Sequence, residues 1–114
     1  MTEWTERELR AVREKLEARL AELADQGERT RADRAPVQLD QSKVGRLSRM
    51  DAMQVQAMSA ETQRRREAEA KRIDAALARI ASGGYGYCVR CEAPIPRKRL
   101  DLNPAAPTCI ACAG

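Results

Sequence analysis

The amino-acid sequence predicts a mostly α-helical protein, an antiparallel two-helix coiled-coil hairpin followed by a C-terminal four-cysteine ribbon. Two long segments carry apolar residues at helical spacing, and a run of helix breakers separates them. All four cysteines lie close to the end of the chain, in two pairs. The 114 residues include no Phe, one Trp and two Tyr, and 33% of them are charged. This composition excludes a large globular interior.

The first helix is predicted over about residues 5–33. Its start is indicated by Thr5-Glu6-Arg7-Glu8, which has the form of a capping box. A single narrow apolar stripe follows, made of Leu9, Val12, Leu16, Leu20 and Leu23. Such a stripe is typical of a helix that packs against one partner. Gly27 weakens the helix and Pro36 ends it, which predicts a turn at about residues 35–41.

The second helix is predicted over about residues 42–82, with Asp40 or Ser42 as its N-cap and Ser82-Gly83-Gly84 as its end. Seven apolar residues are expected to form its seam: Val44, Leu47, Val55, Met58, Ile73, Leu77 and Ile80. Three residues interrupt this seam where leucines would be expected, namely Thr62, Arg65 and Glu69. Because so long a helix needs a partner in water, the simplest arrangement is a hairpin over residues 1–82.

The two cysteine pairs, Cys88-Val-Arg-Cys91 and Cys109-Ile-Ala-Cys112, have the spacing of a zinc ribbon. Each pair can direct two sulfurs to one ion about 2.3 Å away, and two pairs complete a tetrahedron. Two disulfides are disfavoured because no signal peptide is recognised at the start of the chain, which favours a reducing cytoplasm. Four packed thiols are disfavoured because the segment is short and polar. Iron held by four thiolates is the alternative metal.

Coordination by four cysteines leaves no open position, so we expect one structural zinc ion in a zinc-finger domain over residues 83–114. The domain has few apolar side chains, and metal binding is expected to replace the missing core. Four basic residues lie in it, Arg90, Arg97, Lys98 and Arg99. They either offset the charge of the metal-bound thiolates or form a surface for nucleic acid or an acidic protein.

The ribbon resembles the DksA/TraR family of bacterial zinc-finger transcription factors. The residues that carry the resemblance are Tyr85-Gly86-Tyr87-Cys88-Val89-Arg90-Cys91, Ile95, Arg99-Leu100, Pro104 and Cys109-Ile110-Ala111-Cys112. The long helix before the finger and the turn near Asp40 are also similar to the family. The resemblance implies that the hairpin enters the secondary channel of RNA polymerase and alters initiation, often together with the alarmone ppGpp.

Three features depart from the family pattern. The best-studied members carry two aspartates three residues apart at the tip, whereas this chain has Asp40 followed by Lys43. A lysine presents the opposite charge, so a different effect on transcription is expected. Glu92-Ala93 stands where a glycine usually follows the first cysteine pair, and the chain ends at Gly114 without the C-terminal helix of longer members.

The tip residues that the resemblance points to as partner-binding are Asp40, Lys43, Arg46 and Arg49. A structural role competes with this interpretation, in which Val44, Leu47 and Met50 pack on the first helix. Arg64-Arg65-Arg66 is interpreted as a solvated helix face in preference to a phosphate-binding site.

Composition narrows the function further. The chain has no histidine and no glycine-rich phosphate loop, and its cysteines are assigned to metal, so it is not expected to be an enzyme. A net charge of +4 favours weak nucleic-acid binding or none, and no apolar stretch is long enough for a membrane span. We therefore expect a cytoplasmic, monomeric regulator that binds RNA polymerase. The alternatives are a zinc-ribbon helical adaptor for another protein and a weak nucleic-acid binder.

Overall fold

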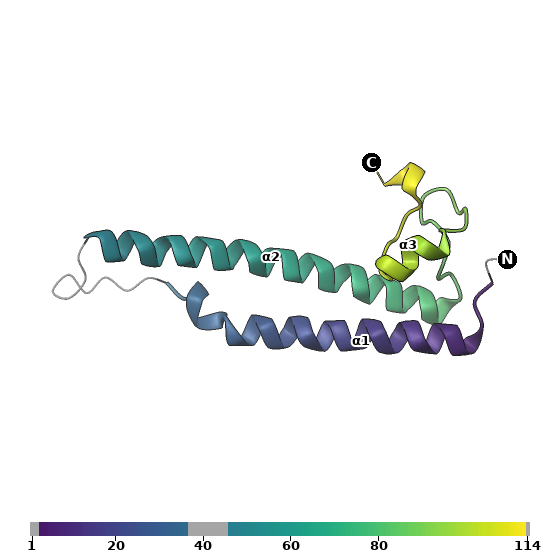
Figure 1. The fold of residues 1–114 in the computed structure, drawn as a ribbon, viewed down its shortest axis with the longest axis horizontal. Coiled ribbons are helices and arrows are strands. Elements are labelled where there is room, and N and C mark those ends of the chain that lie inside the picture. The colour runs from purple at the N-terminus through teal and green to yellow at the C-terminus, as the bar shows by residue number, and fades with distance from the viewer. Residues whose placement is uncertain (1–2, 37–45, 114) are drawn as a thin grey trace. The chain divides into compact units, whose positions relative to one another are not determined.

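The computed structural model describes residues 3–36 and 46–113. Its elements are α1 (Glu6–Arg29), the 3-10 helix η1 (Arg31–Arg34), α2 (Arg46–Ser82), α3 (Arg97–Leu102) and the 3-10 helix η2 (Ile110–Cys112), shown in Figure 1. The predicted fold class is confirmed, because the long helices form a hairpin and the four cysteines cluster near the C-terminus. The described residues contain no strand, only an isolated antiparallel bridge between Tyr87 and Pro94.

Two compact units make up the chain. The finger unit comprises residues 1–21 and 69–114, and the second unit comprises residues 22–68. Each unit contains a piece of α1 beside a piece of α2, as Figure 1 shows. None of the helices in the described part of the chain has the length and apolarity that a membrane crossing requires.

The predicted capping box at the start of α1 is confirmed. The backbone N–H of Glu8 donates to Thr5 Oγ1 at 3.1 Å, and the N–H of Thr5 donates to Glu8 Oε1 at 2.9 Å. Both bonds satisfy donors that the first turn of a helix otherwise leaves without partners. The box fixes the first residue of the helix and leaves the second oxygen of Glu8 available for another donor.

The α-helical part of the first helix ends at Arg29, earlier than the predicted residue 33, and the chain continues as η1. The cause is local side-chain bonding. Thr30 Oγ1 donates to the carbonyl of Gln26 at 2.9 Å, and the guanidinium of Arg34 donates to the carbonyl of Gly27 at 2.8 Å. These side-chain donors contact carbonyls of the last helical turn, which a helix end otherwise leaves short of partners.

The second helix ends at Ser82, as predicted. The N–H of Gly84 donates to the carbonyl of Arg79 at 2.9 Å, and Gly83 has a φ of 87°. This is the Schellman arrangement, in which a left-handed residue caps the helix. The first described residue of α2 is Arg46, and the expected N-caps Asp40 and Ser42 lie outside the described residues.

The finger unit has a small apolar core. Its buried side chains are Leu16, Ile73, Ala76, Ile80, Tyr85, Cys88, Ile95, Leu100, Ala105 and Ala106. Leu16 of the predicted stripe and Ile73 and Ile80 of the predicted seam are among them. Beside this core, Arg19 donates to both carboxylate oxygens of Glu69, at 2.7 and 3.0 Å. An ion pair therefore forms at Glu69, one of the three residues that stand where a leucine would be expected.

In the second unit the predicted seam of α2 is wrong, because Val55 and Met58 are 51% and 65% exposed. The half-buried residues of α2 in this unit are instead Arg49, Gln56, Ser59, Ala60, Gln63 and Arg66. Steps of seven residues back along α2 lead from Leu77 to Gln63 and Gln56, and from Ile80 to Arg66 and Ser59. They do not lead to Val55 or Met58. The apolar residues chosen from the sequence are each one position, about 100° around the helix, away from this seam.

Close packing and hydrogen bonds supplement the apolar contact of this unit, in which Leu23 of the predicted stripe is buried. A Cβ at Gly27, which is buried, would lie 3.1 Å from Oε1 of Gln63. The guanidinium of Arg66 donates to Thr30 Oγ1 at 3.3 Å. The glycine that the sequence marked as a weak point of the helix thus lets α2 approach α1 closely.

Candidate metal centre

The first cysteine pair lies on a tight turn. The N–H of Glu92 donates to the carbonyl of Cys88 at 2.9 Å, and the N–H of Cys88 donates to the carbonyl of Ala93 at 2.8 Å. Glu92 has a φ of 63°, in the left-handed region that favours glycine. The turn at which the resemblance leads us to expect a glycine therefore forms here with a glutamate. The N–H of Arg90 also donates to Cys88 Sγ at 3.4 Å, as expected of a sulfur that carries negative charge.

The second cysteine pair lies on η2, which the bond from the N–H of Cys112 to the carbonyl of Cys109 closes at 3.1 Å. Two bonds align it with the rest of the finger. The N–H of Val89 donates to the carbonyl of Pro107 at 2.9 Å, and Arg99 Nε donates to the carbonyl of Thr108 at 2.9 Å. The two turns consequently present their sulfurs to a common centre.

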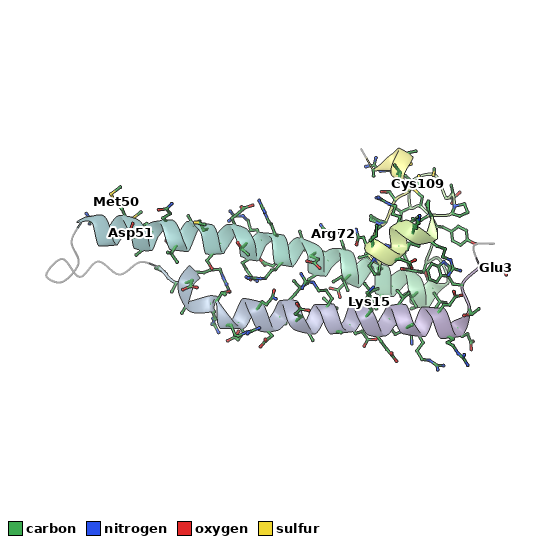
Figure 2. The ribbon with its side chains drawn as sticks, viewed as in Figure 1. Glu3, Lys15, Met50, Asp51, Arg72 and Cys109 are labelled. Atoms are coloured by element: carbon green, nitrogen blue, oxygen red, sulfur yellow. The ribbon has the colours of Figure 1, made fainter. Side chains whose placement is uncertain are left out.

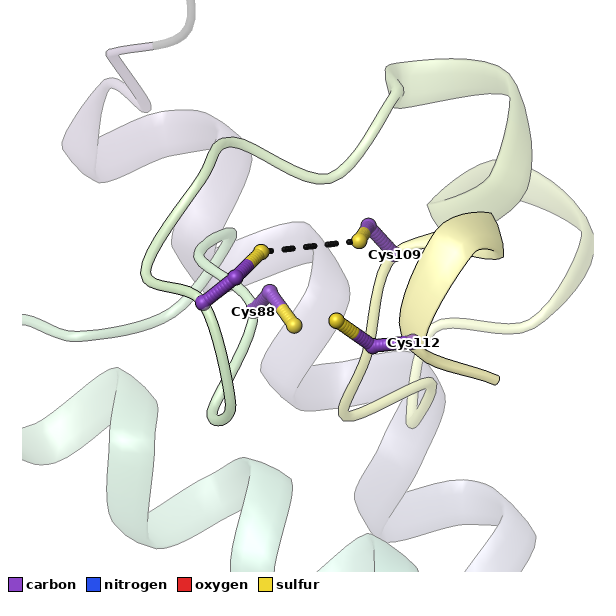
Figure 3. Close-up of side chains that lie close together, drawn as sticks. Cys88, Cys109 and Cys112 are labelled. Atoms are coloured by element: carbon purple, nitrogen blue, oxygen red, sulfur yellow. Dashed lines mark hydrogen bonds between the residues drawn. The ribbon is translucent and has the colours of Figure 1, made fainter. Parts of the chain in front are cut away.

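The four sulfurs fit a tetrahedral metal ion. The Sγ atoms of Cys88, Cys91, Cys109 and Cys112 all lie within 4.8 Å of one another. Cys91 Sγ and Cys109 Sγ are 3.6 Å apart, the contact marked in Figure 3. Four sulfurs about 2.3 Å from a zinc ion are spaced about 3.8 Å apart, whereas a disulfide requires about 2.05 Å. The geometry therefore favours a shared ion and not a disulfide between these two cysteines.

The pKa values of the thiols also favour a shared metal ion. Backbone N–H groups, that of Cys91 most of all, lower the pKa of Cys88 to about 6. The neighbouring sulfurs, Cys109 first, raise the pKa of Cys112 to about 12. Thiolates this close repel one another, and a divalent cation is what allows all four to ionise together. The donor set thus suits a metal that accepts four thiolates.

Arg97 and Arg99, two of the four basic residues, are held inside the finger unit. Arg97 Nη1 donates to Glu8 Oε2 at 2.8 Å, and Arg99 reaches the carbonyl of Thr108. Neither contact is to a cysteine sulfur. Both guanidinium groups have partners within the finger unit, which is neither the offset of thiolate charge nor the partner surface considered from the sequence. Lys98 and Arg90 are exposed.

Sequence reasoning missed Trp4, which packs against the finger. Its ring lies edge-to-face with Tyr85, with centroids 5.1 Å apart, and beneath the guanidinium carbon of Arg97, 3.5 Å from the ring centre. A signal was present, because Trp4 precedes the capping box and Leu9 follows it, the positions of a hydrophobic staple. Both side chains line the same hollow, of about 240 Å³.

Most of the residues that we expect to bind a partner at the tip lie outside the described residues. Asp40 and Lys43 lie outside the described residues, as does Val44, and only the backbone of Arg46 is described, as the first residue of α2. Arg49 is half-buried. In the structural interpretation Met50 packs on the first helix. It is instead 58% exposed, and in Figure 2 its side chain extends outward from the surface of α2.

Two comparisons with known proteins match the chain. Residues 83–114 match the model of the prokaryotic DksA/TraR C4-type zinc finger. The structure of transcription factor DksA2 from Pseudomonas aeruginosa is similar with a TM-score of 0.73 and 25% sequence identity, over 93% of this chain and 80% of that one. No curated protein sequence matches. The finger match and the structural match agree with the resemblance seen in the sequence.

Proposed function

We propose that the chain is a DksA-like protein that regulates bacterial transcription by binding RNA polymerase through its helical hairpin. One combined observation carries the proposal. A finger of DksA/TraR type lies on the same chain as long helices that match a DksA2 transcription factor over most of both proteins. A fold can serve many functions, so the helices alone would not suffice. The finger makes the assignment specific.

In this proposal Cys88, Cys91, Cys109 and Cys112 bind one structural zinc ion. The metal contributes folding free energy to a finger whose core is small. Because four protein ligands leave no site for water or substrate, the ion takes no part in chemistry and the protein is not an enzyme. The role of the finger is to stabilise the end of the hairpin at which α2 ends.

The hairpin reaches the secondary channel of the polymerase, and Asp40, Lys43, Arg46 and Arg49 are the residues we propose to contact it. Lys43 stands where acidic-tip relatives have a second aspartate. Near an active centre that holds catalytic cations, a positive side chain is repelled where a negative one is attracted. The effect on initiation, and its dependence on ppGpp, should accordingly differ from that of acidic-tip relatives.

The test is competition for the channel of core RNA polymerase with a labelled acidic-tip relative, using purified zinc-loaded protein. The wild type should displace the probe at micromolar concentration. Transcription from a ribosomal promoter is then compared for wild type, Asp40→Asn and Lys43→Asp, with and without ppGpp. Lys43→Asp should move the effect toward that of acidic-tip relatives. Asp51→Asn, an exposed carboxylate on α2, is the matched control and should behave as wild type.

Failure of the wild type to compete would refute the polymerase assignment and favour the adaptor alternative, in which the hairpin serves another protein. The proposal also includes a monomer in the cytoplasm, since one hairpin fills one channel. Sedimentation of the free protein and of its polymerase complex measures that stoichiometry.

A further inference from the structure

One arginine joins the finger to the start of the first helix. Arg97 Nη1 donates to Glu8 Oε2 at 2.8 Å, and Arg97 Nη2 donates to the backbone carbonyl of Glu3 at 2.7 Å. Its guanidinium also covers the face of Trp4, with 3.5 Å between the guanidinium carbon and the ring centre. A single side chain of α3 thus holds the N-terminal segment, residues 3–8, by an ion pair, a backbone bond and a cation–π contact.

The other side of the tryptophan is also held by the finger. Tyr85 meets the ring edge-to-face, and a Cβ placed on Gly86 would overlap the indole Nε1. Gly86 has a φ of 95°, so both its backbone and its lack of a side chain suit the close approach of Trp4. The surface that receives Trp4 is therefore built to the shape of this ring.

This receiving surface depends on the folded finger. Tyr85 Oη donates to the carbonyl of Pro104 at 2.8 Å, and the carbonyl of Gly86 accepts from the N–H of Ile95 at 2.8 Å. Arg97 belongs to α3, whose buried residue is Leu100. All these groups lie on the segment between the two cysteine pairs or directly before it. A finger with so few buried side chains requires its metal to keep them in place.

The contact also reaches the cap of α1. Glu8 Oε1 accepts from the N–H of Thr5 while Glu8 Oε2 accepts from Arg97. The same carboxylate therefore accepts one hydrogen bond of the capping box and one hydrogen bond from the finger. If Arg97 were released, the Glu8 carboxylate would lose one of its two donors and the residues before Glu8 would be freed.

We propose that the metal state of the finger controls the N-terminal segment: the loaded finger holds residues 3–8 against Tyr85, Gly86 and Arg97, and loss of metal releases them. The N-terminal segment is then a metal-dependent element that exposes Trp4 and frees the carboxylate of Glu8 when the finger unfolds. This inference does not depend on the identity of the partner of the hairpin.

Trp4 is the single tryptophan of the chain, so its fluorescence reports the segment directly. Zinc-loaded protein is compared with protein from which zinc has been removed by a chelator, and with the same sample after zinc is restored. Removal should shift the emission to longer wavelength and raise quenching by acrylamide, and restoration should reverse both. Amide exchange should accelerate at residues 3–10 and stay unchanged at residues 55–66. Identical emission and quenching in the two states would overturn the proposal.

The arginine is tested separately with zinc bound. Arg97→Met keeps the bulk of the side chain and removes its donors, and Lys98→Met, an exposed neighbour on α3, is the matched control. Arg97→Met should expose Trp4 while still binding one zinc, and its zinc affinity should fall about fivefold because the coupling is reciprocal. Lys98→Met should resemble the wild type. If Arg97→Met leaves Trp4 unchanged, or abolishes zinc binding altogether, Arg97 does not act as the proposed link.

Discussion

The glycines around the finger allow the cost of backbone strain to be separated from the cost of displacing Trp4. Gly83 and Gly86 both have positive φ, 87° and 95°, whereas Gly84 does not. A Cβ on Gly83 would meet nothing within 4 Å, a Cβ on Gly84 would lie 3.8 Å from Ser82 Oγ, and a Cβ on Gly86 would overlap Trp4. Three alanine substitutions therefore differ in one factor at a time.

Gly84→Ala should leave stability within about 0.5 kcal/mol of the wild type. Gly83→Ala should cost about 1–2 kcal/mol, the strain of a left-handed residue with a Cβ. Gly86→Ala carries the same strain and also displaces Trp4 from Tyr85 and Arg97, contacts worth about 0.5–1.5 and about 1 kcal/mol. Its total cost should be about 3 kcal/mol.

The assay is urea unfolding of the zinc-loaded proteins, followed by tryptophan fluorescence and by helical circular dichroism. Gly86→Ala should also show Trp4 more accessible to acrylamide before unfolding begins, whereas Gly83→Ala should not. Equal losses for Gly83→Ala and Gly86→Ala would show that the close approach of Trp4 contributes nothing, and the packing argument would then be wrong.

Three further predictions concern the cysteine turn, the metal and the ion pair. Glu92→Gly should stabilise the finger by about 1 kcal/mol and tighten zinc binding about fivefold, whereas Glu92→Ala, which keeps the Cβ at positive φ, should be neutral in chelator competition. Cys88→Ser or Cys109→Ser should abolish zinc binding in elemental analysis and unfold the finger, with most helical dichroism retained. Hydrogen bonds from Arg19 hold the pKa of Glu69 below its ordinary value of 4.5. The stability from this pair is present above that pH and lost as the pH falls through the lowered pKa, so Glu69→Gln should unfold with a shallower acid dependence.

Local signals in the sequence were enough for much of the fold. The spacing of Cys88, Cys91, Cys109 and Cys112 predicted that the four sulfurs would come together, because each pair needs only one tight turn. The capping box at Thr5 and the end of α2 at Ser82 were predicted for the same reason. In each case the residues that decide the structure are neighbours in the chain.

Contacts between distant parts of the chain could not be predicted in this way. Arg97 and Glu8 are 89 residues apart, and the basic cluster alone gave no means of choosing Glu8 over a nucleic acid. Trp4 was passed over because a single aromatic residue shows no period. The predicted seam of α2 is wrong for another reason. Val55 and Met58 are apolar, but the heptad phase set by Leu77 and Ile80 assigns the half-buried face of the helix to polar residues.

That polar seam leads to a prediction about where the hairpin opens. In the second unit polar residues such as Gln56, Gln63 and Arg66 lie at half-buried positions of α2, whereas Ile73 and Ile80 are buried in the finger unit. Apolar burial contributes about 25 cal/mol per Å², so the second unit gains far less from bringing its helices together. Amide protons of residues 56–66 should accordingly exchange through low-energy local opening, and those of residues 73–80 only through a larger one.

Gln63→Leu tests the cause. Gln63 lies against Gly27, where space is limited but the neighbouring surface is backbone, and a leucine there should bury apolar area and slow exchange at residues 56–66 by about fivefold, equivalent to about 1 kcal/mol. Gln54→Leu, at an exposed position of the same helix, is the control and should change exchange little. Uniform protection along α2 in the wild type, or equal effects of the two leucines, would show that the polar seam does not decide where the hairpin opens.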